Sequence, residues 1–263
     1  MSELIGYIAS ICIGLILGIL GGGGSILSIP ILVYLFHIEP VMASAYSLFI
    51  VGMTSLVGAI PKYKDHLVNI RTGLLFGIPS IVSIFATRKW IVPAIPDVIV
   101  QFDSFILTKR ILLLGLFAVL MILASISMIR NKREISTDDH RFRTILVMVE
   151  GILIGFLTGL VGAGGGFLII PALVLLTGLP FKTAVGTSLF IIAINSLTGF
   201  LGDLLNYPMH WSFLLSVTAL AVIGILIGNT FSRKIPAARL RKIFGWFVLV
   251  MGCWILIRET LLA

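Results

Sequence analysis

The chain has 263 residues, of which 59% are hydrophobic and only 11% are charged. A soluble globular domain carries about 25% charged residues, so this composition excludes a large soluble domain. The net charge is +8, but the basic residues crowd into short segments between apolar stretches, which is the pattern of membrane topology rather than of nucleic-acid binding. We therefore expect an all-α polytopic membrane protein whose partner is the lipid bilayer and not a nucleic acid.

Eight apolar stretches follow one another along the chain, at residues 4–36, 41–60, 72–87, 111–129, 145–177, 183–202, 211–230 and 243–260. A helix that crosses a bilayer needs roughly 20 residues, so the first and fifth stretches are too long for one crossing. A glycine run interrupts each of these two. Since each glycine in a helix interior costs about 1 kcal/mol relative to alanine, the runs predict a break. We expect two shorter helices around an unwound joint, either as a re-entrant hairpin or as two tilted spans.

The two joints are Gly21–Ser25 and, 141 residues later, Gly162–Gly166. The helix after each joint is expected to begin at the last glycines, where its unpaired N–H groups and its dipole attract an anion. Glycine also lets the backbone approach a ligand closely. The candidate binding residues here are Gly22, Gly23, Gly24, Ser25, Gly164, Gly165 and Gly166. The alternative is that these glycines only permit close packing of helices.

The stretch after each joint carries polar residues at helical spacing. In the first half, Ser44, Ser47, Thr54, Ser55 and Gly58 fall within roughly a 100° arc of a helix. In the second half the matching positions are Ser188, Asn195, Ser196 and Gly199, and Thr187 stands beside them. Their hydroxyl and amide groups can donate to an anion without adding charge, which makes candidates of Ser47, Ser55, Thr187, Ser188, Asn195 and Ser196. The alternative is that they join helices through hydrogen bonds.

Residues 88–110 form a basic loop in this interpretation, with an amphipathic interfacial piece at Ile91–Phe105. We expect no charged residue in the middle of a span, which argues against a proton relay at the bilayer centre. Both cysteines lie in apolar segments, and no metal-ligand spacing, Walker A motif, G-x-S-x-G or H-E-x-x-H is present. We therefore expect no metal site, no cofactor and no catalytic activity. We also do not expect an ATP-driven pump.

The two halves of the chain are related in sequence. Without a gap, Gly18–Ile60 aligns with Gly159–Leu201, and 18 of the 43 pairs are identical. We divide the single membrane domain into a first repeat at 1–130, a linker at 131–142 and a second repeat at 143–263. Each repeat then holds a glycine-broken helix or re-entrant hairpin and three further spans. Related halves that each begin with an interrupted apolar segment are typical of secondary transporters.

The basic residues favour one topology. If the two long stretches each cross once, eight simple spans result, the repeats are parallel, and the lysines and arginines divide 9 against 10 between the two sides. If each long stretch leaves and returns to one side, the division becomes 14 against 5, and the repeats are inverted. The positive-inside rule favours the second arrangement. It places 131–142 in the cytoplasm, both termini outside, and the two joints close together near the midplane.

The joint motifs resemble those of the sulfite exporter TauE/SafE family. The first copy reads Gly14-x3-Gly18-x2-Gly-Gly-Gly-Gly-Ser with Pro30, Ala43 and Ser47-Leu48, and the second reads Gly155-x3-Gly159-x2-Gly-Ala-Gly-Gly-Gly-x4-Pro171 with Ala184-x-Gly186-Thr187-Ser188. The resemblance covers about residues 5 to 258. It implies transport of sulfite, sulfoacetate or a related sulfur-containing anion across a bacterial plasma membrane. The first copy has Tyr46 in place of the threonine, so we expect a polar contact to be lost there.

Together these observations predict a secondary transporter, in the export direction, of a small sulfur-containing anion, working by alternating access in a prokaryotic plasma membrane. Two other hypotheses remain open at this stage, a passive anion channel and a non-transporting membrane scaffold subunit. The sequence does not decide between one chain and a homo-oligomer.

Overall fold

The computed structural model of the chain describes residues 2–22, 24–102, 105–129 and 140–261. These residues are almost entirely helical, which confirms the expected all-α membrane class. Seven helices in the described part are long and apolar enough to cross a membrane: Pro40–Lys64, Ile70–Ala94, Lys109–Ile129, Thr144–Val161, Phe181–Leu204, Trp211–Lys234 and Ala237–Glu259. The protein is therefore a multi-pass membrane protein.

The first half begins with α1 (Ser2–Leu20) and α2 (Gly24–Pro30), and α2 continues as the π-helical turn η1 (Ile31–Leu35). The longer helix α3 (Pro40–Lys64) follows, with proline at its first position, where the missing N–H costs nothing. Next comes α4 (Ile70–Ala86), which Asn69 caps by accepting the Thr72 N–H at 3.0 Å. The first half ends with α6 (Lys109–Ile129).

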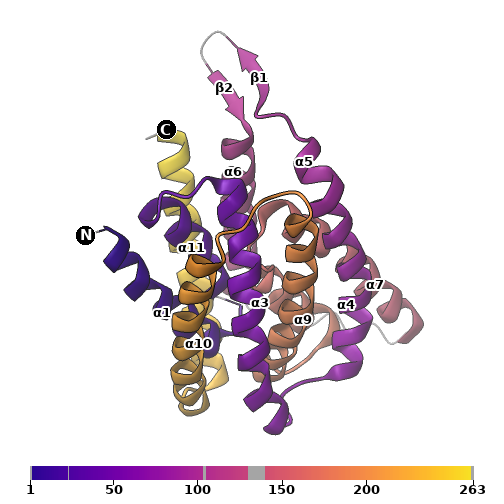
Figure 1. The fold of residues 1–263 in the computed structure, drawn as a ribbon. Coiled ribbons are helices and arrows are strands. Elements are labelled where there is room, and N and C mark those ends of the chain that lie inside the picture. Colours follow the sequence, from indigo (N-terminus) through magenta and orange to yellow (C-terminus); the bar gives the residue numbers. More distant parts are fainter. Residues whose placement is uncertain (1, 23, 103–104, 130–139, 262–263) are drawn as a thin grey trace.

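The expected loop 88–110 is wrong in its first part. After α4 the helix continues without a break through η2 (Thr87–Ile91) and α5 (Val92–Ala94), so the span reaches seven residues beyond the predicted end at 87. An antiparallel hairpin then forms from β1 (Val98–Phe102) and β2 (Phe105–Thr108) and projects from one end of the molecule (Figure 1). The predicted interfacial piece Ile91–Phe105 is therefore divided between a helix end and this hairpin.

The second half repeats the order of the helices, without a counterpart of the β-hairpin among the described residues. It consists of α7 (His140–Val161), α8 (Gly166–Thr177), α9 (Phe181–Leu204), α10 (Trp211–Lys234) and α11 (Ala237–Leu261). Most of the expected linker, residues 131–139, lies outside the described residues. Each half thus has one helix interrupted by the glycine run and three longer helices after it.

The chain reverses direction at each glycine run. In the first half, the ring of Tyr7 near the start of α1 lies 5.3 Å from the ring of Phe36 just after η1. In the second half, Val147 on α7 and Thr177 at the end of α8 line one cavity. Each pair of short helices therefore forms a hairpin, and the alternative of one straight crossing does not describe the structure.

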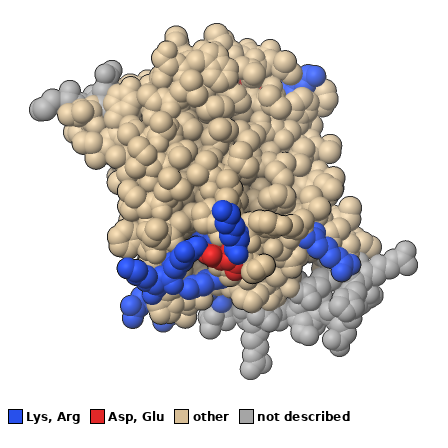
Figure 2. Space-filling view, turned by 60° about the horizontal axis from the view of Figure 1, so that its bottom comes forward, with Lys and Arg blue, Asp and Glu red and all other residues tan. Residues whose placement is uncertain are grey.

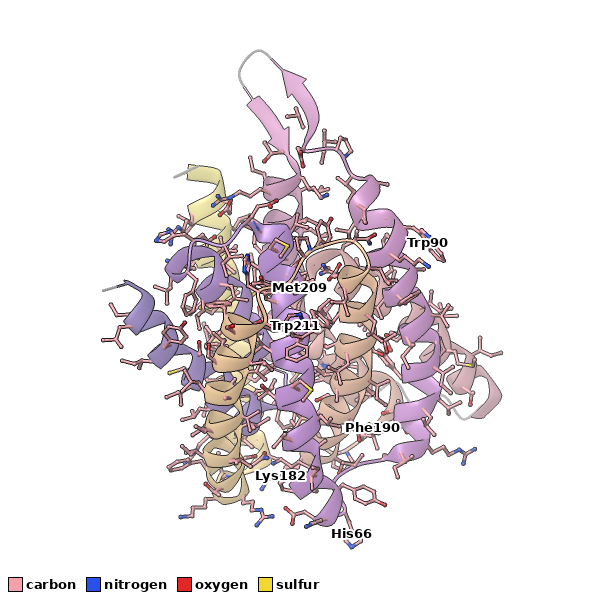
Figure 3. All side chains as sticks on the ribbon, in the orientation of Figure 1. His66, Trp90, Lys182, Phe190, Met209 and Trp211 are labelled. Atoms are coloured by element: carbon pink, nitrogen blue, oxygen red, sulfur yellow. The ribbon has the colours of Figure 1, made fainter. Side chains whose placement is uncertain are left out.

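The helix pairs follow the sequence repeat. α1 packs on α10 and α7 packs on α4, while α3 pairs with α9 and α6 pairs with α11 (Figure 1). α3 and α9 run antiparallel at the centre, because Leu48 lies against Gly199 and Lys62 lies against Gly186. The side-chain view agrees: His66, just after α3, and Lys182, at the start of α9, lie toward the same end (Figure 3).

Several glycines outside the joints serve helix packing. A methyl group added at Gly14 of α1 would lie 1.7 Å from the carbonyl oxygen of Ala221 on α10, and one at Gly155 of α7 would lie 2.6 Å from that of Ser80 on α4. Such small residues let the backbones of two helices approach each other. In a membrane this close packing matters because burial of apolar surface alone drives helix association only weakly. The two broken hairpins are thereby held tightly against the long helices of the other half.

Lysines and arginines gather at the end of the molecule where α3 ends and α9 begins (Figure 2). The described basic residues at this end include the buried Lys62 and also Lys64, Arg71, Lys182, Arg233, Lys234, Arg239, Arg241 and Lys242. Asp65 binds Arg233 there, with 2.8 Å between Oδ2 and Nη2.

Candidate functional site

The two glycine joints touch each other at the centre of the structure. α2 begins at Gly24 and α8 at Gly166, as predicted. A methyl group at Gly22 would lie 2.3 Å from the carbonyl carbon and oxygen of Gly166, and one at Gly166 would lie 2.6 Å from the α-carbon of Gly22. Only glycine at both positions allows this backbone contact. Gly23 lies outside the described residues.

The second joint is built from left-handed backbone. Gly164 and Gly165 have φ of +67° and +69°, a region that side-chain-bearing residues seldom adopt. This turn lies between two neighbouring helices: a methyl group at Gly164 would lie 2.9 Å both from Ser196 Oγ on α9 and from Val51 on α3. At Gly165 it would lie 2.1 Å from Thr158 Oγ1 on α7.

The first joint is closed by its own serines. Ser25 Oγ donates to the Gly22 carbonyl oxygen at 2.6 Å, and Ser28 Oγ lies 2.6 Å from Ser47 Oγ on α3. The predicted binding residues Ser25 and Ser47 thus form hydrogen bonds to other groups of the protein. Gly24 packs against Ile13 and Leu17 of α1.

The polar stripes of α3 and α9 are buried, as predicted, and several of their polar atoms are unsatisfied. Thr54 Oγ1, Ser55 Oγ, Asn195 Oδ1 and Ser196 Oγ have no hydrogen-bond partner within the described structure. They occupy the same two positions of the repeat, Thr54 with Asn195 and Ser55 with Ser196. An unpaired buried polar atom costs roughly 1–3 kcal/mol. Two such pairs therefore lie at equivalent positions of the repeat on the two central helices, and Ser196 of these pairs faces Gly164 of the second joint.

Asn195 is only half satisfied. Its Nδ2 donates to Ser80 Oγ on α4 at 2.6 Å, and its Oδ1 has no partner among the described groups. Ser188, by contrast, donates to the Val185 carbonyl oxygen of its own helix at 2.8 Å.

Thr187 holds a helix start and does not contact the joints through its hydroxyl. Thr187 Oγ1 accepts the backbone N–H of Asn69 at 2.9 Å. In the first half the backbone N–H of His210 donates in the same way to Tyr46 Oη, at 3.0 Å. The expectation that a contact is lost at Tyr46 is therefore wrong, because the phenol reaches the same donor that threonine reaches in the other half.

Two cavities lie at equivalent positions of the repeat, one at each end of the molecule. The first, of about 540 Å³, is lined mainly by polar residues and opens at the basic end: Asn69, Arg71, Thr72, Leu75, Thr144, Val147, Thr177 and Leu179. The second, of about 380 Å³, is mainly aromatic and apolar: Tyr7, Phe36, Ile38, Glu39, Met42, Tyr46, His210 and Phe213. Phe36 takes the place of Thr177 and Phe213 that of Thr72, so the first cavity is lined by threonines where the second is lined by aromatic rings.

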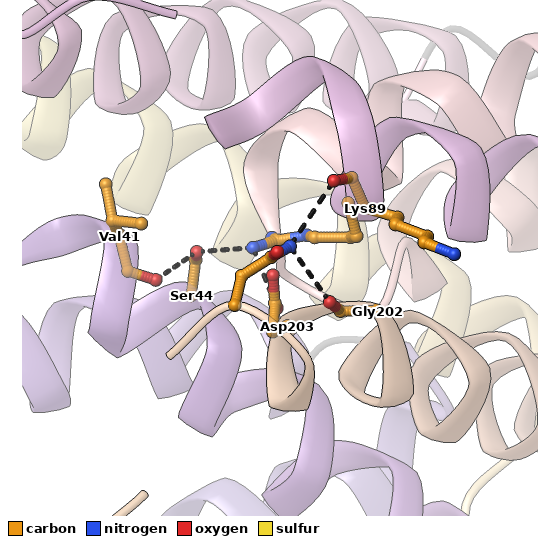
Figure 4. A network of polar contacts seen from close by, with 7 residues as sticks. Val41, Ser44, Lys89, Gly202 and Asp203 are labelled. Carbon is orange, nitrogen blue, oxygen red and sulfur yellow. Dashed lines mark hydrogen bonds and ion pairs between the residues drawn. The ribbon is translucent and has the colours of Figure 1, made fainter. Parts of the chain in front are cut away.

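A buried ion pair beside the second joint was missed by the sequence analysis. Arg88 and Asp203 have no exposed side-chain surface, and Arg88 Nη1 lies 3.1 Å from Asp203 Oδ2 (Figure 4). Arg88 Nη1 also donates to Ser44 Oγ at 2.8 Å. Arg88 lies near the end of the span Ile70–Ala94, at a position where the sequence analysis expected a loop.

Two signals in the sequence could have indicated this pair. Asp203 continues the polar stripe of α9 at helical spacing after Ser196 and Gly199. The apolar residues Trp90, Ile91 and Val92 after Arg88 allow the span to be extended past it. Nothing local, however, pairs an arginine with an aspartate 115 residues away.

Comparison with known proteins assigns the chain to a family and agrees with a multi-pass membrane protein. The family model described as sulfite exporter TauE/SafE matches residues 7–255. The chain is 27% identical to Probable membrane transporter protein YunE of Bacillus subtilis, covering 94% of this chain and 96% of that one. It is 28% identical to a Probable membrane transporter protein of Xylella fastidiosa, covering 94% and 92%, and 27% identical to Probable membrane transporter protein MJ0441 of Methanocaldococcus jannaschii, covering 94% of each. No solved structure matches the chain significantly.

Proposed function

Because this chain belongs to the sulfite exporter TauE/SafE family, a family of membrane transporters, we propose that it is a secondary transporter that exports a small sulfur-containing anion such as sulfite or sulfoacetate. Transport proceeds by alternating access, and the anion binds where the two glycine joints meet. Membership in a transporter family also supports a role other than catalysis.

One observation carries this proposal. The joints contact each other at Gly22 and Gly166, and the unsatisfied hydroxyl of Ser196 on α9 faces Gly164 of the second joint. The unsatisfied hydroxyl of Ser55 occupies the repeat-equivalent position on α3. Backbone N–H groups at the start of α8 and neutral hydroxyls together suit an anion that must be bound and then released. The proposed binding residues are the described joint glycines with Ser55, Asn195 and Ser196. Four further predicted residues support the site indirectly, through hydrogen bonds to other groups of the protein: Ser25, Ser47, Thr187 and Ser188.

Inverted repeats are part of the proposal. The antiparallel course of α3 and α9 and the hairpins at both joints support it. In an inverted repeat, rocking of one half against the other closes one entrance and opens its equivalent. The two repeat-related cavities, one polar and one aromatic, suit the two entrances of such a cycle.

The orientation follows from charge. The basic end faces the cytoplasm under the positive-inside rule, which puts both termini outside the plasma membrane of a prokaryote. An inside-negative membrane potential then drives one negative charge outward with about 2.3 kcal/mol per 100 mV, so export needs no proton relay.

The test is flux into proteoliposomes under an imposed potassium-diffusion potential, with sulfite, sulfate, sulfoacetate, taurine and chloride as the panel. We expect saturable, potential-sensitive movement of sulfite or sulfoacetate. Flux that does not saturate would replace the transporter with a passive channel. Absence of flux of every anion, from protein shown to be folded, would overturn the proposal and favour a scaffold subunit.

A further inference from the structure

Arg88 is the largest side chain with no exposed surface in the described structure. It extends from η2, the continuation of α4, and only one of its three nitrogens has partners. Nη1 donates to Ser44 Oγ at 2.8 Å and to Asp203 Oδ2 at 3.1 Å, so α3 and α9 both hold this nitrogen (Figure 4).

The other two nitrogens, Nε and Nη2, have no hydrogen-bond partner among the described residues. They form one edge of the guanidinium, the edge that can bind two oxygens of one anion side by side. Arg110 uses this same edge on the carboxylate of Glu259, with Nε to Oε2 and Nη2 to Oε1 both at 3.2 Å. In Arg88 a buried cation therefore presents its fork-shaped edge without an acceptor.

This edge points at the second joint. A methyl group at Gly162 would lie 2.0 Å from Arg88 Nη2 and 2.3 Å from the β-carbon of Ser44. Gly162 has φ of +79° and opens the turn that leads to α8. Arg88 Nη2 thus packs directly against the backbone of the second joint, and both a guanidinium and a helix N-terminus favour negative charge.

The other half lacks this arrangement. At the repeat-equivalent positions, Arg88 is replaced by Asn229, Asp203 by Lys62 and Ser44 by Val185. Asn229 Nδ2 donates to the Gly58 carbonyl oxygen at 3.2 Å, and Lys62 Nζ donates to Ser232 Oγ at 3.0 Å. Because the same fold is completed there without an arginine, helix packing does not require a guanidinium at this place.

We propose that the Nε and Nη2 edge of Arg88 binds two oxygens of the transported anion beside Gly162, while Asp203 and Ser44 hold Nη1 and fix the direction of the fork. This inference rests on the proposed function and adds the charged recognition group to it. The favoured substrates are anions with two or more oxygens on one atom, such as sulfite or a sulfonate. A halide offers only one atom to the fork and is disfavoured.

The test compares the wild type with Arg88→Lys, which keeps the positive charge but loses the fork. Both proteins are measured by calorimetric titration with sulfite and with chloride in detergent, and by sulfite flux in proteoliposomes. We expect Arg88→Lys to weaken sulfite binding and raise the KM for sulfite by at least about tenfold, and to reduce the preference for sulfite over chloride. Arg233→Lys, at an exposed ion pair with Asp65, is the matched control and should leave both quantities unchanged.

Each outcome decides one of the two proposals. A wild type that transports sulfite, with Arg88→Lys unchanged in KM and in selectivity, overturns the role of Arg88 and leaves the transporter standing. Sulfite binding that depends on Arg88 but occurs without flux supports the site and overturns transport. If the wild type neither binds nor transports sulfite, both proposals fail for this anion. If Arg88→Lys lowers the thermal stability and the maximal flux but leaves KM unchanged, the role of Arg88 is structural and the inference is overturned.

Discussion

Gly22 of the first joint and Gly166 of the second lie in backbone contact, so close that a methyl group on Gly166 would stand 2.6 Å from the α-carbon of Gly22. The neighbour on each side is main chain, which cannot move aside as a flexible side chain can. The contact ties the two broken hairpins to each other where the central helices α3 and α9 cross.

Substitution of Gly166 by alanine should therefore be destabilising. We expect a loss of about 1–3 kcal/mol in the free energy of unfolding, because the added methyl group forces the two joints apart. Gly115→Ala in α6 is the control, since a methyl group there meets nothing within 4 Å and favours the helix. Thermal unfolding in detergent measures both. Equal stability of the two variants would contradict the contact.

Alanine in place of both Ser55 and Ser196 separates a binding role from a packing role. Each hydroxyl is buried without a partner in the described structure, so its removal should leave stability unchanged or raise it. If the hydroxyls bind the anion, KM should still rise, by about tenfold for the loss of two hydrogen bonds. Ser10→Ala, which removes a bond to the Gly6 carbonyl oxygen of the same helix only, is the control. A double variant with unchanged KM would exclude the hydroxyls from the site.

Tyr46→Phe and Thr187→Val should have equal and mainly structural effects. Each removes the side-chain oxygen that accepts a backbone N–H, from His210 in one case and from Asn69 in the other. We expect each to lower the free energy of unfolding by about 0.5–1.5 kcal/mol with little change in KM. Denaturation together with flux kinetics tests this, and a large rise in KM for Thr187→Val alone would restore threonine to the binding site.

The Arg88–Asp203 pair should show strong coupling in a double-mutant cycle. Asp203→Ala leaves a buried cation without its counter-ion, at a cost of about 3–5 kcal/mol. Replacement of both residues, as Arg88→Met with Asp203→Leu, should be much less destabilising, because no uncompensated charge then remains. The exposed pair Arg233–Asp65 provides the comparison and should couple by less than about 1 kcal/mol. Additive effects at Arg88 and Asp203 would contradict the buried pair.

The joints and stripes could be predicted because their signals are local. Glycine runs break helices wherever they occur, and the repeat of the run from Gly21 to Gly162 indicates two equivalent hairpins. The spacing of Ser55 and Ser196 indicated a buried face, and both side chains are fully buried. Burial of a polar stripe follows from the apolar environment on the other faces of the same helix.

The features that the sequence did not predict depend on contacts between residues that lie far apart in the chain. The length of the third predicted stretch, 72–87, was underestimated because Arg88 and Lys89 resemble a span end, whereas the helix continues past them and Arg88 pairs with Asp203 inside the protein. Tyr46 was expected to lose the contact that threonine makes, and only the position of His210 shows that a longer side chain recovers it. The hairpin of β1 and β2 replaced part of an expected amphipathic piece, because its strands pair with each other from Val98 to Thr108.

Counterflow of radiolabelled sulfite in proteoliposomes tests the central claim most directly. Vesicles loaded with unlabelled sulfite should accumulate the label transiently above its external concentration, because an alternating-access carrier exchanges one bound anion for another. Gly164→Val should insert and remain folded yet show no accumulation, since a branched side chain would fit neither a φ of +67° nor the 2.9 Å left to Ser196 Oγ. Flux without accumulation in the wild type, or normal counterflow in folded Gly164→Val, would contradict a transport site built at the glycine joints.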